Sequence, residues 1–337
     1  MGEQLSHLAL KGFVKLILAA KRVVITTHIN PDADGVGSQL ALAHALLSLG
    51  KEVTCVNEAE MGRRWGRFLP NKLFLSSEEF LKQKNRKAKL PKIDLMIVMD
   101  THTPERIGSN MQMLLQKSER FIFIDHHPCS RYSRAIHCID SEAAATGELV
   151  GRLISLMGVP FSPEIARALY TAIVVDTSSF RYPTVSAATH HLVATLLEDK
   201  KINPSEVYSH LYGAKAISHL QILGEVLREA QVNGDHTIAW ISIPRRLLKR
   251  FRVSEEDTNP FINHLLNVDR VKVVMMFRES AKAGQVKVSF RSNGSVDVSE
   301  IAKTLGGGGH NHSAAVILTG RMSEVIVRTV AVAELLL

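Results

Sequence analysis

Cysteine is scarce in this chain of 337 residues, which contains only Cys55, Cys129 and Cys138. Three scattered cysteines cannot build the dense disulfide framework of small secreted domains. Long apolar runs are missing too, because the longest are too short to span a bilayer, and the sequence has no internal repeat or low-complexity tract. We therefore expect a globular, cytoplasmic protein that is kept reduced and does not bind membranes.

The first 21 residues lack the basic segment and the uninterrupted apolar stretch of a secretory signal peptide. Lys11 and Lys15 interrupt the apolar residues at helical spacing, which predicts an amphipathic first helix. Hydrophobic residues make up 45% of the chain and charged residues 22%, as is typical of folded rather than disordered proteins. The 41 basic and 33 acidic residues give a net charge of +8, which modestly favours anionic partners such as phosphate compounds.

Five apolar segments rich in β-branched and aromatic residues are predicted to be strands. They are RVVITTH ending at His28, KEVTCVNE, IDLMIVMD ending at Asp100, FIFID ending at Asp125 and TAIVVD ending at Asp176. Helical patterns lie between them, and those at 38–50 and 146–158 finish on a glycine of C-cap type. This alternation predicts a parallel sheet with helices on both faces, and in such sheets ligands bind beyond the carboxyl ends of the strands.

The stretch HINPDADGVGS, residues 28–38, is the densest group of polar candidates. His28, Asp32 and Asp34 lie on one short turn that contains proline, so the turn can present an imidazole and two carboxylates. We expect the two glycines of this stretch to bend the backbone before a helix that Ser38 caps.

Six residues form the predicted metal-ligand set: His28, Asp32, Asp34, Asp100, His126 and Asp176. A mixed nitrogen and oxygen set without thiolate suits Mn²⁺, Mg²⁺ or Zn²⁺ better than it suits a structural zinc. Six ligands exceed what one catalytic ion with an open position needs, and they suit two ions that share a bridging carboxylate. Paired ions about 3.5–4 Å apart stabilise both the attacking and the leaving oxygen in phosphoester cleavage.

These motifs resemble, in order, those of the DHH phosphoesterase superfamily. The resemblance is carried by HINPDADGVGS, the lone Asp100, DHH at 125–127 and Asp176. Near the C-terminus, VKVSFRSNGSVDVSEIAKTLGGGGHNHSAA is similar to the DHH-associated substrate-binding domain, whose signature is an Arg-Ser pair followed by a glycine-rich loop ending in His. The resemblance spans almost the whole chain. The length of the chain is similar to that of proteins of the nanoRNase and pAp-phosphatase group.

The resemblance implies a role for each motif residue. The first ion would be held by His28, Asp32 and Asp100. The second would be held by Asp34, Asp100, His126 and Asp176, with Asp100 bridging. Asp125 would orient a ligand or the loop, and His127 would stabilise the charge that develops on the substrate phosphate. A metal-activated water would attack phosphorus, with Mn²⁺ as the favoured ion and Mg²⁺ or another divalent ion as the alternative.

In the C-terminal domain the resemblance implies substrate contacts from Arg291, Ser292, Gly307, Gly308, Gly309 and His310. Glycines can expose backbone N–H groups because no Cβ blocks the approach of a phosphate, and an arginine can bind it in bidentate fashion. The family loop usually continues with two small residues and then glycine, whereas Ala315 stands in the glycine place here. This departure concerns the fine shape of the pocket.

We predict a catalytic domain over residues 1–195, a helical linker over 196–215 and a smaller mixed α/β substrate-binding domain over 216–337. The substrate is expected in the cleft between the two domains. The oligomeric state is open, and a homodimer is one option.

The expected function is hydrolysis of small nucleotide substrates by a two-metal phosphoesterase. The substrates would be short single-stranded oligoribonucleotides, 3′-phosphoadenosine 5′-phosphate (pAp) or linear dinucleotides. Three alternatives stay open: a family II inorganic pyrophosphatase, a RecJ-like single-strand exonuclease and a nucleotide-binding regulator without turnover. The glycine-rich loop argues against the pyrophosphatase, and the intact ligand set argues against the regulator.

Overall fold

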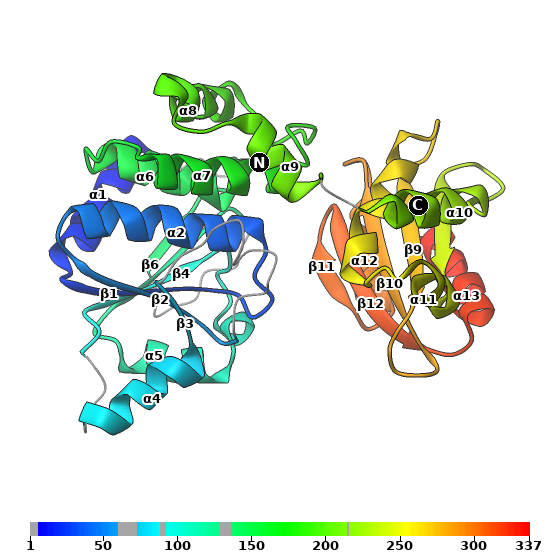
Figure 1. Ribbon diagram of the computed structural model, residues 1–337, viewed down its shortest axis with the longest axis horizontal. Helices are drawn as coiled ribbons and strands as arrows, with labels where there is room; N and C mark the ends of the chain where they lie inside the picture. The colour runs from blue at the N-terminus through cyan, green and yellow to red at the C-terminus, as the bar shows by residue number, and fades with distance from the viewer. Residues whose placement is uncertain (1–5, 60–72, 88–91, 128–135, 214–215) are drawn as a thin grey trace. The chain divides into compact units, whose positions relative to one another are not determined.

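The structure, a computed structural model, describes residues 6–59, 73–87, 92–127, 136–213 and 216–337. The chain divides into two units, Met1–Leu211 and Tyr212–Leu337, and Figure 1 shows a separate sheet in each. None of the helices in the described ranges combines the length and the apolar character needed to cross a bilayer.

The first unit is built on a six-stranded sheet in which every pairing is parallel. Its strand order is β3 (Phe74–Ser76), β2 (Glu52–Asn57), β1 (Arg22–Thr27), β4 (Leu95–Met99), β5 (Phe121–Asp125) and β6 (Ile136–Ile139). All five residues of β4 are buried, as expected for a strand with helices on both faces. The predicted parallel sheet is confirmed.

Helices cover both faces of this sheet (Figure 1). One face carries α2 (Ala33–Ser48), α6 (Thr146–Leu156) and α7 (Pro163–Asp176), with α1 (His7–Ala19) packed beside α6. The opposite face carries α4 (Ser77–Lys87) and α5 (Ser109–Lys117), where Phe80, Met111 and Leu114 pack against the sheet residues Met96 and Phe123. Within the described ranges, the other helical segments of the unit are η1 (Pro104–Ile107), α8 (Ala187–Leu197), η2 (Glu198–Lys200) and α9 (Pro204–Leu211).

The segment TAIVVD is not a strand, and this sequence prediction was wrong. Its residues are the last turns of α7, which begins with Ser162 as N-cap and Pro163 in its first turn and ends at Asp176. A helix buried among other helices is apolar on all sides, so a short apolar run does not distinguish it from a strand. Asp176 therefore comes from a helix end, not from the sheet.

The helix after His28 begins earlier than predicted. Asp32, not Ser38, is the N-cap of α2, and its Oδ1 accepts hydrogen bonds from the backbone N–H groups of Asp34 and Gly35. Gly35 and Gly37 lie inside the helix and serve close packing, since a Cβ on Gly37 would lie 2.5 Å from the carbonyl oxygen of a neighbouring helix residue. This start places Asp34 in the first turn, facing the sheet edge.

The second unit contains a mixed six-stranded sheet, as predicted. Its order is β11 (Gly308–His310), β12 (Ser313–Thr319), β10 (Gln285–Ser292), β9 (Val273–Glu279), β8 (Ile238–Ile243) and β7 (Gln231–Val232). Only the β8–β9 pairing is parallel. One face packs against α12 (Val298–Thr304) and α13 (Met322–Leu335), and the other against α10 (Ile217–Arg228), α11 (Arg245–Phe251) and η3 (Glu256–Asn267).

Candidate active site

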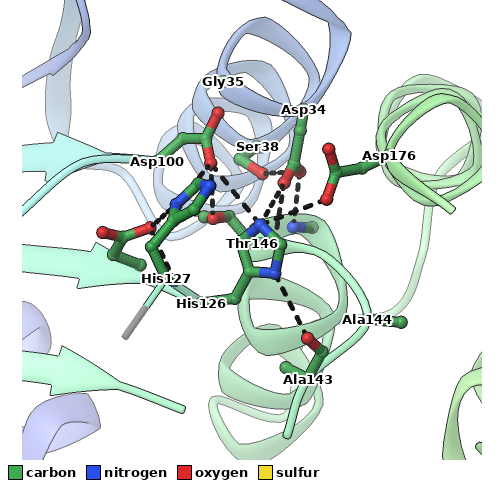
Figure 2. A network of polar contacts seen from close by, with 12 residues as sticks. Asp34, Gly35, Ser38, Asp100, His126, His127, Ala143, Ala144, Thr146 and Asp176 are labelled. Atoms are coloured by element: carbon green, nitrogen blue, oxygen red, sulfur yellow. Dashed lines mark hydrogen bonds and ion pairs between the residues drawn. The ribbon is translucent and has the colours of Figure 1, made fainter. Parts of the chain in front are cut away.

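Three neighbouring strands end at the same edge of the parallel sheet and deliver polar residues there. His28 follows β1, Asp100 follows β4, and His126 follows Asp125, the last residue of β5. These three strands are adjacent in the order β1-β4-β5. The residues after them therefore converge, together with the start of α2 and the end of α7 (Figure 2).

Three groups of possible metal ligands lie at this edge, each with its ligand atoms within 4.8 Å of one another. The groups are His28, Asp32 and Asp100; Asp34, His126 and Asp176; and Asp100, His126 and His127. Asp100 faces two histidines with different oxygens, because Oδ2 lies 3.5 Å from His28 Nε2 and Oδ1 lies 3.9 Å from His126 Nε2. One carboxylate is thus placed between two neighbouring ligand groups.

Asp100 is held in an unusual backbone conformation. Its φ is +59°, in the left-handed region where non-glycine residues store about 1–3 kcal/mol of strain. Its backbone N–H donates to the carbonyl of Ile124 at 2.9 Å, and its Oδ1 accepts from the Thr146 hydroxyl at 3.0 Å. These contacts fix a side chain that is only 2% exposed.

Asp34 is held by the start of α6. Its Oδ2 accepts from the backbone N–H of Thr146 at 2.7 Å and its Oδ1 from that of Gly147 at 2.8 Å. The Ser38 hydroxyl donates to Oδ1 at 3.2 Å. The N-terminus of a helix stabilises a carboxylate through such N–H groups and its dipole. A Cβ on Gly147 would lie 2.6 Å from that of Ala172, so a glycine is needed for this close approach.

The site is buried on the sheet side and open on the other. The side chains of Asp34 and Asp100 are 1% and 2% exposed, whereas those of Asp32 and Asp176 are 50% and 32% exposed. A ligand can therefore reach the cluster past Asp32 and Asp176.

The donor set fits divalent cations. His126 Nε2 is buried and has no hydrogen-bond partner among the residues that the structure describes. It lies 3.1 Å from Asp176 Oδ2 and 3.8 Å from Asp34 Oδ2. Atoms that share one octahedral ion lie about 3 Å apart, because each is bound at roughly 2.0–2.2 Å. His126 Nδ1 donates to the carbonyl of Ala143 at 3.2 Å, which leaves Nε2 as the ligand atom.

The electrostatics of the cluster favour the binding of a positive charge, because several carboxylates lie close together. Burial and the charge of Asp176 raise the pKa of Asp34 to about 7. Burial and the charges of Asp34 and Asp32 raise the pKa of Asp100 well above its ordinary value. Burial would lower the pKa of His126, but the charges of Asp176 and Asp34 raise it to about 10. A divalent cation would replace the protons that hold these like charges together.

Asp125 lies beside the ligand groups and contacts His127, which belongs to one of them together with Asp100 and His126. Asp125 Oδ1 is 2.6 Å from His127 Nδ1 and its Oδ2 is 2.7 Å from His102 Nδ1. His127 Nδ1 also lies 3.8 Å from Asp100 Oδ1. The structure therefore brings together all eight candidate residues predicted for this domain.

In the second unit, three of the predicted contact residues, Arg291, Gly308 and Gly309, line a cavity, whereas Ser292 is buried. A cavity of about 290 Å³ is lined by Asn259, Met276, Lys287, Ser289, Arg291, Gly308, Gly309, Ser313, Ala314 and Ala315. The described residues that line it include two cationic side chains and no carboxylate, so its charge favours an anion. Ser292 is fully buried, with its hydroxyl 3.3 Å from His312 Nδ1.

The glycine-rich segment serves close strand packing. A Cβ on Gly307 would lie 2.4 Å from the Ala315 oxygen, and one on Gly309, whose φ is +151°, would lie 2.4 Å from the Ala314 Cα. The backbone of Gly308–His310 pairs with Ser313–Ala315, which brings Gly308 and Gly309 to the cavity. The side chain of His310 lies outside the described part of the chain.

The sequence analysis did not identify Thr146, Lys287 or Asn259 as candidate site residues. The sequence offers one signal for Thr146, which follows three alanines at the start of a helical pattern. Lys287, Ser289 and Arg291 alternate along one strand and so point to one face of it. Asn259 has no local signal.

Two segments of the chain match known families. Residues 22–173 match the DHH family, N-terminal domain, and residues 242–334 match the DHHA1 domain. The bifunctional oligoribonuclease and PAP phosphatase NrnA of Thermus thermophilus is 31% identical over 299 residues, which are 88% of this chain and 84% of that protein.

Solved structures are similar over both units. An exopolyphosphatase-related protein from Bacteroides fragilis has a TM-score of 0.86 at 27% identity, covering 98% of this chain and 95% of that one. RecJ of Thermus thermophilus in complex with Mn²⁺ has a TM-score of 0.53 at 14% identity, covering 96% of this chain and 54% of that one, a likeness of fold alone. Both domain families match, the similarity to NrnA extends over most of both proteins, and the motif residues converge at one edge of the sheet. This chain therefore belongs to the DHH family.

Proposed function

We propose that this protein is a metal-dependent phosphoesterase that hydrolyses small nucleotide substrates such as pAp, short oligoribonucleotides or linear dinucleotides. The observation that carries the proposal is the placement of Asp100, whose two oxygens face His28 and His126 in different ligand groups. The similarity to an oligoribonuclease and PAP phosphatase supports the choice of substrate class.

The residues fit two divalent ions, and we propose Mn²⁺ as the favoured pair. His28, Asp32 and Asp100 would hold one ion. Asp34, His126 and Asp176, with the second oxygen of Asp100, would hold the other. When bound, such a pair supplies an activated water and neutralises phosphate charge.

The chain's own residues would orient the reaction around that pair. Asp32 and Asp176 lie at the open side of the cluster, so the scissile phosphate would enter there. His127, anchored to Asp125 through Nδ1, would stabilise negative charge on the phosphate through its other ring nitrogen. The buried side of the cluster excludes water, which strengthens these electrostatic contacts.

We assign the second unit to substrate binding. Lys287 and Arg291 line its cavity together with Asn259 and the backbone of Gly308 and Gly309. Burial and the neighbouring charges of Arg278 and Arg291 lower the pKa of Lys287, and a bound phosphate would offset that repulsion. The cavity would hold a part of the nucleotide remote from the scissile phosphate, so that remote binding energy orients the reacting centre.

A side-by-side assay tests the proposal. Purified protein with Mn²⁺ is incubated with pAp, a short RNA, a cyclic dinucleotide and pyrophosphate, and phosphate or mononucleotide release is measured with and without chelator. Turnover of pAp or short RNA that chelator abolishes is expected. Preferential turnover of pyrophosphate would favour the inorganic pyrophosphatase, and tight nucleotide binding without turnover would favour a regulator.

A further inference from the structure

The carboxylate of Asp125 lies between two imidazoles, and the proposed chemistry uses only one of them. His102 Nδ1 lies 2.7 Å from Oδ2, and His127 Nδ1 lies 2.6 Å from Oδ1. Asp125 is fully buried, while both histidine side chains are 19% exposed. Each oxygen of the carboxylate therefore has its own imidazole partner.

The direction of these hydrogen bonds follows from the chemistry of the carboxylate of Asp125. Its Oδ1 already accepts from the backbone N–H of His127 at 3.2 Å, and each oxygen lies at hydrogen-bond distance from one Nδ1. An ionised carboxylate only accepts hydrogen bonds. Both rings therefore donate through Nδ1, and Nε2 of His127 is the ring nitrogen turned to other partners.

His102 contacts the second carboxylate oxygen of Asp125, Oδ2. The ring of His127 and its backbone N–H, at 3.2 Å, both bond to Oδ1, whereas His102 contacts Oδ2. With donors on one oxygen only, the carboxylate could turn about its Cβ–Cγ bond and carry the ring of His127 with it. A donor on Oδ2 prevents that rotation.

The position of His102 makes the contact possible. It lies two residues after Asp100, on the short segment between β4 and η1. The turn that presents Asp100 to the ligand cluster therefore also presents His102 to Asp125. His102 and Asp125 are 23 residues apart in the chain, and their contact joins the ends of β4 and β5, which are neighbours in the sheet.

We propose that His102 is a positioning residue, which holds Asp125 from its second side and thereby fixes His127 against the substrate phosphate. The inference rests on the proposed phosphoesterase function. His102 itself contacts neither substrate nor metal in this role. The role needs an N–H donor at the place of Nδ1, which an asparagine amide can supply and an alanine cannot.

Kinetics of two variants and a control test the proposal. His102→Ala, His102→Asn and His210→Ala are compared with the wild type for kcat and KM on pAp, bound metal and thermal midpoint. His210 is the matched control, because its Nδ1 bonds a backbone carbonyl of Glu206 on the exposed helix α9. We expect His102→Ala to lower kcat by roughly 10- to 100-fold with little change in KM or bound metal, His102→Asn to recover most of kcat, and the control to match the wild type.

Two results would overturn the proposal. Wild-type kcat in His102→Ala would show that Asp125 needs no second donor. Equal losses in the alanine and asparagine variants, or losses that follow bound metal and thermal midpoint, would assign His102 to the fold or the metal site.

A second readout does not depend on turnover. Histidine-labelled protein is examined by NMR for the downfield imidazole N–H protons that short histidine–carboxylate hydrogen bonds produce. The wild type should show such signals for His102 and His127, and the His127 signal should shift or broaden in His102→Ala but persist in His102→Asn. An unchanged His127 signal in His102→Ala would refute the positioning role. A wild type that shows both signals and hydrolyses no nucleotide would refute the proposed function instead.

Discussion

Thr146 contacts two of the proposed metal ligands, and its hydroxyl can be removed by substitution without removing its backbone contact. The hydroxyl donates to Asp100 Oδ1 at 3.0 Å, and the backbone N–H donates to Asp34 Oδ2 at 2.7 Å. Thr146 is fully buried, and valine has nearly its shape. Thr146→Val therefore removes the hydroxyl contact and keeps the backbone contact.

Thr146→Val should lower metal affinity more than it lowers the free energy of unfolding. Burial and neighbouring carboxylates raise the pKa of Asp100 well above its ordinary value, so the metal-free site disfavours the ionised carboxylate. The hydrogen bond from the Thr146 hydroxyl is strongest when Asp100 is ionised, and a bound cation favours the ionised form. A hydrogen bond to a charged group contributes about 1.5–3 kcal/mol, which corresponds to about 10- to 150-fold in affinity.

Calorimetric titration of chelator-treated protein with Mn²⁺ measures this loss. The weakening should be larger for the ion beside His126, because Asp100 Oδ1 faces that histidine. Thr146→Ser keeps a hydroxyl and serves as the control, with affinity near that of the wild type. Wild-type Mn²⁺ affinity in Thr146→Val, or equal weakening in both variants, would refute the assigned role of the hydroxyl.

Asp100→Ala should lower kcat more than His127→Ala, because Asp100→Ala removes a ligand shared by both ions, whereas His127→Ala removes one charge-stabilising contact that contributes about 10²–10³ in rate. The test measures kcat and bound metal in both variants. Near-normal turnover with two bound ions in Asp100→Ala would contradict the bridging role. The raised pKa of Asp34, about 7, stabilises the metal-free fold below the unfolded pKa of about 4, and this stability is lost as pH rises through about 7. Scanning calorimetry should therefore show a thermal midpoint that falls between roughly pH 5 and pH 8 and that Mn²⁺ makes less dependent on pH. Arg291→Ala should raise KM for pAp and leave the slow hydrolysis of bis-(p-nitrophenyl) phosphate unchanged, whereas equal losses on both would assign Arg291 to the fold or the metal site.

The strand ends could be predicted because each carries its own local signal. The apolar runs before His28 and Asp100 and the run that ends at Asp125 alternate with helical patterns, and a parallel sheet gathers their carboxyl ends at one edge. The strand order β1-β4-β5 in the structure makes these ends neighbours. No knowledge of contacts distant in the chain was needed for this part of the fold.

Helix boundaries were less predictable. The run before Asp176 is apolar on every side because α7 packs among other helices, and its start signal, Ser162–Pro163, lies upstream of the segment that looked like a strand. Asp32 acts both as the cap of α2 and as a member of a ligand group. Sequence alone offered Ser38 as an equally good cap.

The contacts that orient the ligands lie beyond local patterns. Thr146 bonds Asp100 across 46 residues and Asp34 across 112 residues. Such pairs exist only once the sheet has brought separate loops together. The same holds for Asn259, which lines a cavity with residues of β10 and β11 and has no motif of its own.

Anomalous diffraction at the manganese edge, from crystals grown with Mn²⁺, tests most directly the claim that Asp100 is shared between two ions. We expect two peaks about 3.5–4 Å apart, one beside His28 and one between His126 and Asp176, each bound to a different oxygen of Asp100. A single peak, or two peaks of which one does not contact Asp100, would contradict it.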